Sequence, residues 1–99
     1  MNILEVLEKA RAKIDKPQKW CAYWSQSDDS HRLGVDGAVW ATAGHKTEES
    51  EAAFRLLAEH SGVNDMWKPY DRVVYVSLHK AVMKMFDRAI EELKAKEEE

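Results

Sequence analysis

Aromatic side chains beside cationic ones are the residues of this sequence best suited to chemistry, and that chemistry is molecular recognition. Trp67 directly precedes Lys68, with Arg72 close behind, and Trp24 begins a polar run. Aromatic faces stack on nucleobases while Lys and Arg contact phosphates, and Trp, Tyr and Arg are enriched at the energetic centres of protein interfaces. The sequence therefore predicts a ligand- or partner-binding surface, for which we select six residues: Trp20, Trp24, Arg32, Trp67, Lys68 and Arg72.

Large rings also serve hydrophobic cores, because each buries about 150–250 Å² when it packs inside. Trp40 and Trp20 are expected to pack largely in the core, with Cys21 beside Trp20. Trp24 and the edge at Arg32 are expected to face outward, since polar residues surround them. The role of Trp20 therefore stays open between the core and the binding surface.

The sequence contains no recognisable catalytic or metal-binding motif. Cys21 is the only thiol, and its apolar neighbours favour an unreactive one. The four histidines are not spaced one helical turn apart, as ligand pairs on a helix would be. Gly34 and Gly37 lack the Lys-Ser/Thr pair of a phosphate-binding loop, and Asp28-Asp29 in a serine-rich segment is typical of a turn. We expect no catalytic residue, no metal and no cofactor.

The charge distribution is uneven, although the net charge is only −3. Between positions 9 and 19 the sequence contains five cationic residues and a single acidic one, Asp15. The chain ends in three glutamates. The cations are Lys9, Arg11, Lys13, Lys16 and Lys19. Binding of nucleic acid through this segment is a weaker alternative, and such binding would lose affinity steeply with salt. The acidic start of the helix expected at 48–61 argues against a DNA-recognition helix there.

The 99 residues predict a single domain over 1–99, with an acidic, frayed tail at 94–99. A lone cysteine cannot form an internal disulfide, which is typical of a reducing compartment. The N-terminus lacks the apolar run of a signal peptide, and no apolar stretch approaches the ~20 residues of a membrane-spanning helix. A cytoplasmic protein without membrane association is expected.

Hydrophobic spacing predicts a mainly α (α+β) fold of three to four packed helices and one small β-hairpin. The first helix is expected over 2–15, capped by Asn2 and stopped by Pro17. Aromatic residues and the turn chemistry of Ser27 to Ser30 predict the hairpin around residues 18–33. A short buried helix is expected over 35–43, with Gly44 at its end.

Two further helices complete the predicted fold. The helix over 48–61 is expected to be capped by Thr47 and terminated by Gly62. The last helix is predicted from one broad apolar stripe: Leu78, Val82, Met85, Phe86, Ala89, Ile90 and Leu93. Its start stays open between two alternatives. Either Ser77 caps it after a strand over 73–76, or Asp71 caps a longer helix.

The chain resembles a family of small bacteriophage and bacterial proteins that carry a domain of unknown function. The motifs that carry the resemblance are VLEKARAKI, KPQKW, SDDS, VDGAV, AAFRLLAE, Trp67 and MFDRAI, which together cover most of the chain. Relatives often carry Trp-Cys where this sequence has Val35-Asp36. The resemblance implies a helical fold and a phage or prophage origin, hence the cytoplasm of a bacterial host. It implies no activity.

The function expected from these features is that of a small, non-catalytic phage or prophage accessory protein. It would bind and block a host protein, or sequester a nucleotide-type small molecule, through the aromatic and basic surface. Self-association into a homo-oligomer is also consistent with exposed rings. The alternatives are a nucleic-acid-associated module and an enzyme whose site is not visible in the sequence.

Overall fold

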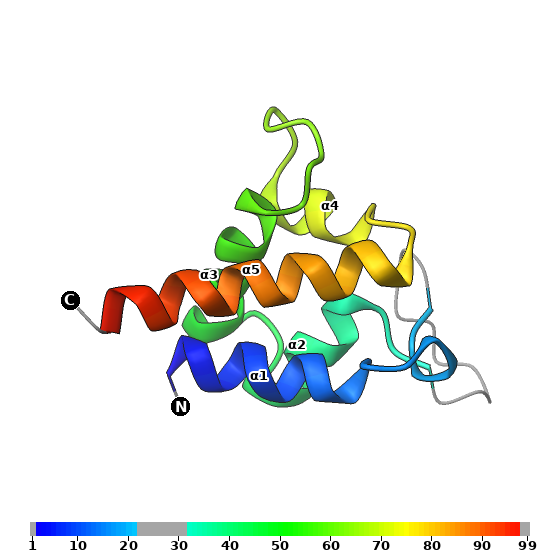
Figure 1. Ribbon diagram of the computed structural model, residues 1–99, viewed down its shortest axis with the longest axis horizontal. Helices are drawn as coiled ribbons and strands as arrows, with labels where there is room; N and C mark the ends of the chain where they lie inside the picture. Colours follow the sequence, from blue (N-terminus) through cyan, green and yellow to red (C-terminus); the bar gives the residue numbers. More distant parts are fainter. Residues whose placement is uncertain (1, 22–31, 98–99) are drawn as a thin grey trace.

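The computed structural model describes residues 2–21 and 32–97, and these form a mainly helical protein, as predicted (Figure 1). The elements in chain order are α1 (Ile3–Lys13), the 3-10 helix η1 (Pro17–Lys19), α2 (Val35–Ala43), α3 (Glu48–Glu59), α4 (Pro69–Val74) and α5 (His79–Glu97). The helices α1 and α5 lie side by side along the long axis, and α3 crosses behind them. Within the described residues, no helix has the length and apolar character needed to cross a membrane.

The predicted caps at the starts of two helices are confirmed. The Asn2 side-chain oxygen accepts a hydrogen bond from the Glu5 N–H at 2.8 Å, and Thr47 Oγ1 accepts one from the Ser50 N–H at 3.1 Å. These bonds satisfy N–H groups that the first turn of a helix leaves unpaired. Lys16 is extended, with φ −123° and ψ 145°, as expected for a residue before proline. The chain therefore leaves α1 before it reaches Pro17.

The core is built from apolar residues of all five α-helices. Its largest fully buried side chains include Phe86, Leu7, Leu57 and Met85, and Val73 joins them from α4. The predicted stripe of α5 is buried from Val82 to Ile90, with Leu93 half-buried. Leu78 is the exception, since it lies before the first turn of α5 and is 69% exposed. The prediction that Leu78 belongs to the core stripe was wrong.

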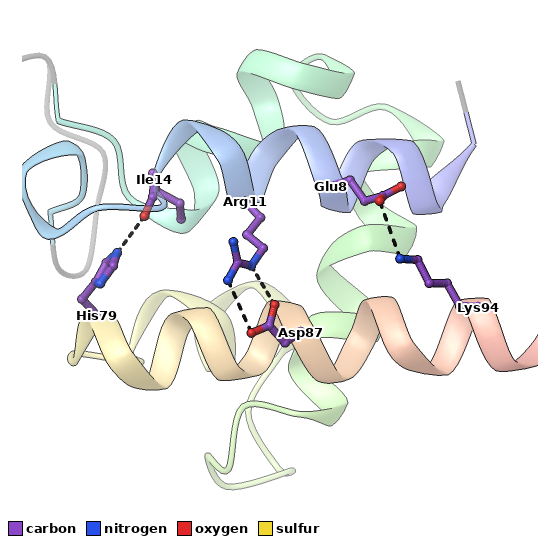
Figure 2. A network of polar contacts seen from close by, with 6 residues as sticks. All are labelled: Glu8, Arg11, Ile14, His79, Asp87 and Lys94. Atoms are coloured by element: carbon purple, nitrogen blue, oxygen red, sulfur yellow. Dashed lines mark hydrogen bonds and ion pairs between the residues drawn. The ribbon is translucent and has the colours of Figure 1, made fainter.

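Three polar contacts join α1 to α5 on the outside of this core (Figure 2). Arg11 Nε donates to Asp87 Oδ1 at 2.7 Å, and Lys94 Nζ lies 4.0 Å from Glu8 Oε2. The third contact joins His79 Nε2 to the carbonyl oxygen of Ile14, 2.7 Å away. Residue numbers rise along one helix as they fall along the other, so the two helices are antiparallel.

The β-hairpin predicted around residues 18–33 is not seen in the part of this segment that the structure describes, residues 18–21 and 32–33. Residues 17–19 form η1, and the described chain contains only one isolated bridge in this region, between Trp20 and Leu33. The bridge is parallel: the Cys21 N–H donates to Leu33 O, and the Leu33 N–H donates to Lys19 O. A tight hairpin requires antiparallel strands. The turn expected at 27–30 lies outside the described residues.

Neither alternative for the start of the last helix is correct. Residues 73 and 74 are helical, because Pro69 at the first helical position starts the separate helix α4 after an extended Lys68. The α4 helix ends at Val74, and the chain enters α5 only at His79. The two valines are buried because α4 turns them inward, rather than because they belong to a strand. At the other end, α5 continues through Glu97, well into the segment expected to be a frayed tail.

Gly44 ends α2 with a positive φ of 92°, and Gly62 follows α3 with φ 72°. A Cβ on Gly44 would lie 2.9 Å from Thr47 Cγ2, whereas a Cβ on Gly62 would meet nothing within 4 Å. Thr47 is held in place, because its hydroxyl donates to Ala43 O and accepts from the Ser50 N–H. An alanine at position 44 would therefore both strain the backbone and clash with the Thr47 side chain.

We expect Gly44→Ala to lower the free energy of unfolding by about 2 kcal/mol, and Gly62→Ala by about 1 kcal/mol. The first value includes partial loss of the Thr47 cap. Urea denaturation followed by circular dichroism measures both. Equal losses in the two variants would show that the contact with Thr47 is relieved at no cost.

Candidate binding surface

Exposed apolar side chains gather where the loop before α4 meets the end of that helix. Met66 is 87% exposed, Trp67 43% and Tyr75 44%. The rings of Trp67 and Tyr75 contact each other edge to face, with centroids 4.8 Å apart and an interplanar angle of 65°. A shallow groove is lined by Met66, Trp67, Lys68, Asp71 and Tyr75. We call these five residues the Trp67 surface.

Local hydrogen bonds hold the loop that presents this surface. The Asn64 side-chain oxygen accepts from the Met66 N–H at 2.9 Å, and the Asn64 carbonyl accepts from the Trp67 N–H at 3.1 Å. Such side-chain-to-backbone bonds are typical of asparagine in turns. Arg72 Nε donates to the Trp67 carbonyl at 3.0 Å and ties the loop to α4. Trp67 is therefore placed by its backbone, while its ring stays accessible.

The six residues selected from the sequence fall into different parts of the molecule. Trp67 and Lys68 belong to the Trp67 surface, and Arg72 supports it from α4. Arg32 is exposed beside Leu33. Trp24 lies outside the described residues.

Trp20 is half-buried and packs against the core, where its ring lies 5.6 Å from that of His79. That ring contact joins the segment after η1 to the first turn of α5. The structure thus brings together three of the six residues, around the start of α4.

Tyr75 and Met66 were missed by the sequence reasoning. The sequence reasoning left Tyr75 open between a strand over 73–76 and a longer last helix, and it did not use the i, i+4 spacing of Asp71 and Tyr75, which places both on one face of a helix. Had Pro69 been recognised as a helix start, this spacing would have identified Tyr75. Met66 carries no signal of its own, since single methionines are common in cores.

A second group of aromatic side chains is internal and fixes the position of α4. The Tyr70 ring stacks on Trp40, with centroids 5.5 Å apart and planes inclined by 14°, and Phe54 meets both rings edge to face. The Tyr70 hydroxyl donates to Asp36 Oδ2 at 2.9 Å, and Asp36 Oδ1 accepts from the Gly37 N–H at 2.8 Å. Asp36 is only 2% exposed. This buried polar contact joins α2 to α4.

Tyr70 is a proton donor here rather than a base. Burial raises the pKa of Tyr70 above its ordinary value, and the hydrogen bond and negative charge of Asp36, with the charge of Asp71, raise it further. The hydroxyl therefore keeps its proton at neutral pH and continues to bond the Asp36 carboxylate. The pair positions helix α4 and, through it, the Trp67 surface.

The basic N-terminal segment is partly neutralised within the protein. Arg11 is paired with Asp87, and Lys19 Nζ lies 3.3 Å from Asp15 Oδ1. Lys9, Lys13 and Lys16 are exposed. The segment therefore offers a partner fewer open cations than its sequence indicates.

One group of metal-ligating side chains lies apart from this surface, where the end of α3 faces α5. It consists of Glu59, His60 and Glu92. Cys21 is half-buried beside the Trp20–Leu33 bridge.

Comparison with known proteins returns no match to a family model, to a curated protein or to a solved structure. The resemblance to small phage and bacterial proteins therefore stays a prediction.

Proposed function

We propose that this chain is a small, non-catalytic binding protein that attaches to a partner protein through the Trp67 surface and blocks it. The observation that supports this proposal is the exposed Met66–Trp67–Tyr75 cluster on a loop held by hydrogen bonds. Trp, Tyr, Met and Arg are the residue types enriched in the buried centres of protein interfaces. Large apolar side chains displayed together on a soluble domain mark such a site.

The arrangement of the rings favours a protein partner over a nucleotide. Trp67 and Tyr75 meet edge to face, so they do not form two parallel walls between which a base could lie. Asp71 lies beside Lys68 and Arg72 and partly neutralises their positive charge. Little net positive charge therefore remains at this surface to attract a phosphate. A partner segment with apolar side chains, covering Met66 and the Trp67 ring, fits this chemistry best. The bacterial host as the source of the partner rests on the family resemblance, whereas the blocking role is part of this proposal, because the resemblance implies no activity.

The first test is a comparison of three versions of the purified, immobilised protein in bacterial lysate. Wild type, Trp67→Ala and Leu78→Ala are used, and retained proteins are quantified by mass spectrometry. Leu78 is the matched control, because it is apolar and 69% exposed but does not line the groove. We expect a protein retained by wild type and Leu78→Ala, and lost with Trp67→Ala.

Titration of the retained protein then gives the size of the effect. Trp67→Ala should weaken binding at least tenfold, because truncation of a central aromatic residue costs about 2 kcal/mol or more. Its melting temperature should stay close to that of wild type, since the ring is 43% exposed. Equal weakening by Trp67→Ala and Leu78→Ala would indicate unspecific apolar adhesion and contradict the proposal.

Two other experimental outcomes would replace the proposed binding of a partner protein with a different function. A nucleotide that raises the melting temperature of wild type but not of Trp67→Ala would identify a small-molecule binder instead. A mass that rises with protein concentration in sedimentation, and falls to the monomer value in Trp67→Ala, would identify a second copy of the chain as the partner.

A further inference from the structure

Three potential metal ligands converge where the end of α3 faces the middle of α5. Glu59 is the last residue of α3, His60 is its C-cap, and Glu92 comes from α5. One ligand atom from each side chain lies within 4.8 Å of the others. The cluster joins two helices and combines an imidazole with two carboxylates.

Two of the polar atoms in this cluster are buried without a hydrogen-bond partner. They are His60 Nε2 and Glu92 Oε2, although the two side chains as wholes are 23% and 33% exposed. Buried polar atoms nearly always have a partner, because an unmet one costs free energy. Lys96 Nζ lies 3.8 Å from Glu92 Oε2, which provides charge but no hydrogen bond. Both atoms therefore point to a ligand.

The spacing between His60 and Glu92 suits a metal ion better than a direct bond. His60 Nε2 lies 3.7 Å from Glu92 Oε1, beyond the ~2.7–3.2 Å of a hydrogen bond. Zinc binds imidazole and carboxylate at about 2.0–2.2 Å, so two of its tetrahedral ligand atoms lie about 3.3–3.6 Å apart. Small side-chain rotations would bring the observed distance into this range.

We propose that Glu59, His60 and Glu92 form a binding site for Zn²⁺ that fastens the end of α3 to α5. The three side chains supply one nitrogen and two oxygen ligands, and a water completes the tetrahedron. Two of the three ligands, Glu59 and His60, line a groove whose other side is formed by Lys84 and Arg88 of α5.

The ligand atoms, and not the cations in this groove, select the metal. Lys84 and Arg88 oppose any positive ion, so the ligands have to outweigh their charge. Imidazole and carboxylate together favour Zn²⁺ over Mg²⁺ and Ca²⁺, which prefer all-oxygen sites and retain water. The site is separate from the Trp67 surface, so the proposed partner binding does not depend on it.

Calorimetric titration of chelator-treated full-length protein with ZnCl₂ tests this site, using wild type, Glu92→Gln, His60→Gln and Glu91→Gln. Glu91 is the matched control, because it is the exposed neighbour of Glu92 on the same helix. We expect one Zn²⁺ per chain in wild type and in Glu91→Gln, and at least tenfold weaker binding in the other two variants. Excess Zn²⁺ should raise the melting temperature of wild type by several degrees.

Spectra of the Co²⁺-substituted protein provide a second readout that does not depend on stability. Wild type and Glu91→Gln should show the intense visible bands of tetrahedral cobalt, and Glu92→Gln should not. If His60→Gln fails to fold, Glu92→Gln alone decides the question. Absence of Zn²⁺ binding at millimolar concentration would overturn the proposal, as would binding that all the variants retain. Equal affinity for Mg²⁺ would contradict the choice of metal.

Discussion

Phe86→Ala is expected to lower the free energy of unfolding by about 3–5 kcal/mol, the usual cost of removing a buried phenylalanine. Phe86 is fully buried, and it is the largest such side chain of the described core. Helices α1 and α5 surround that core from one side and α3 from behind, so little of the cavity can collapse. For a domain of this size, the loss corresponds to a fall in melting temperature of about 15 °C or more.

Urea denaturation monitored by circular dichroism measures this loss, with Leu78→Ala as the control. Leu78 belongs to the same predicted stripe but is exposed, so its replacement should change stability by less than about 0.5 kcal/mol. Phe86→Leu keeps most of the volume and provides a folded intermediate case if Phe86→Ala unfolds entirely. A loss below 1 kcal/mol in Phe86→Ala would contradict the placement of α5 in the core.

Tyr70→Phe is expected to cost about 2–3 kcal/mol, although it removes a single oxygen atom. The ring that stacks on Trp40 is retained, so the aromatic group is unchanged. What is lost is the donor to Asp36 Oδ2, on a carboxylate that is 2% exposed. A buried carboxylate that loses one of its donors keeps its desolvation cost with less compensation, although the Gly37 N–H still donates to Oδ1.

A double-mutant cycle with Asp36→Ala isolates this contact. If the hydroxyl and the carboxylate act together, Tyr70→Phe should cost much less in the Asp36→Ala background than in wild type. Additive losses in the cycle would show that the two groups stabilise the fold independently, and would contradict the assigned role.

The same contact predicts a loss of stability at alkaline pH. Burial and the neighbouring Asp36 and Asp71 raise the pKa of Tyr70 in the folded protein above the value of about 10 that it has in an unfolded chain. The stabilising effect is therefore fully present below pH 10 and is lost as the pH rises beyond it, because only the unfolded chain then releases this proton. Stability measured between pH 9 and 11 should fall less steeply in Tyr70→Phe than in wild type.

Elements with both a clear apolar period and a local cap were predictable from the sequence. Asn2 and Thr47 mark the starts of α1 and α3 because an oxygen side chain can satisfy the first turn without help from the rest of the fold. The α5 stripe from Val82 to Ile90 was predictable because a single buried face repeats at helical spacing. Such signals depend on neighbouring residues in the sequence, so they hold whatever tertiary contacts the rest of the chain makes.

Elements that depend on a few residues in a tertiary setting were not predictable in the same way. The Val73–Val76 run has high β-propensity, but Pro69 starts a helix before it, and Val73 and Val74 are buried as the last residues of that helix, α4. The segment at Trp20 contains strand-forming aromatic residues, yet its described residues make a single parallel bridge, from Trp20 to Leu33. Propensity in short segments is easily overridden by packing.

The candidate sites also differ in whether their residues are close together or far apart in the sequence. Trp67, Lys68 and Arg72 were selected from the sequence because they are close together along the chain, and they lie together in space. Tyr75 joins them only once α4 is helical. The Asp36–Tyr70 contact and the cluster around His60 link residues more than thirty positions apart, 34 between Asp36 and Tyr70. No pattern within a short stretch of sequence predicts contacts between residues so far apart.

The antiparallel pairing of α1 with α5 has a consequence for synthesis on the ribosome. Its contacts close loops of 65 residues between Ile14 and His79 and 76 residues between Arg11 and Asp87. At about 5–20 residues per second, α1 emerges several seconds before the helix that covers it. Helices α2 and α3, which also pack on α1, are made in the meantime. The side of α1 that contacts α5 therefore stays uncovered until α5 has been made.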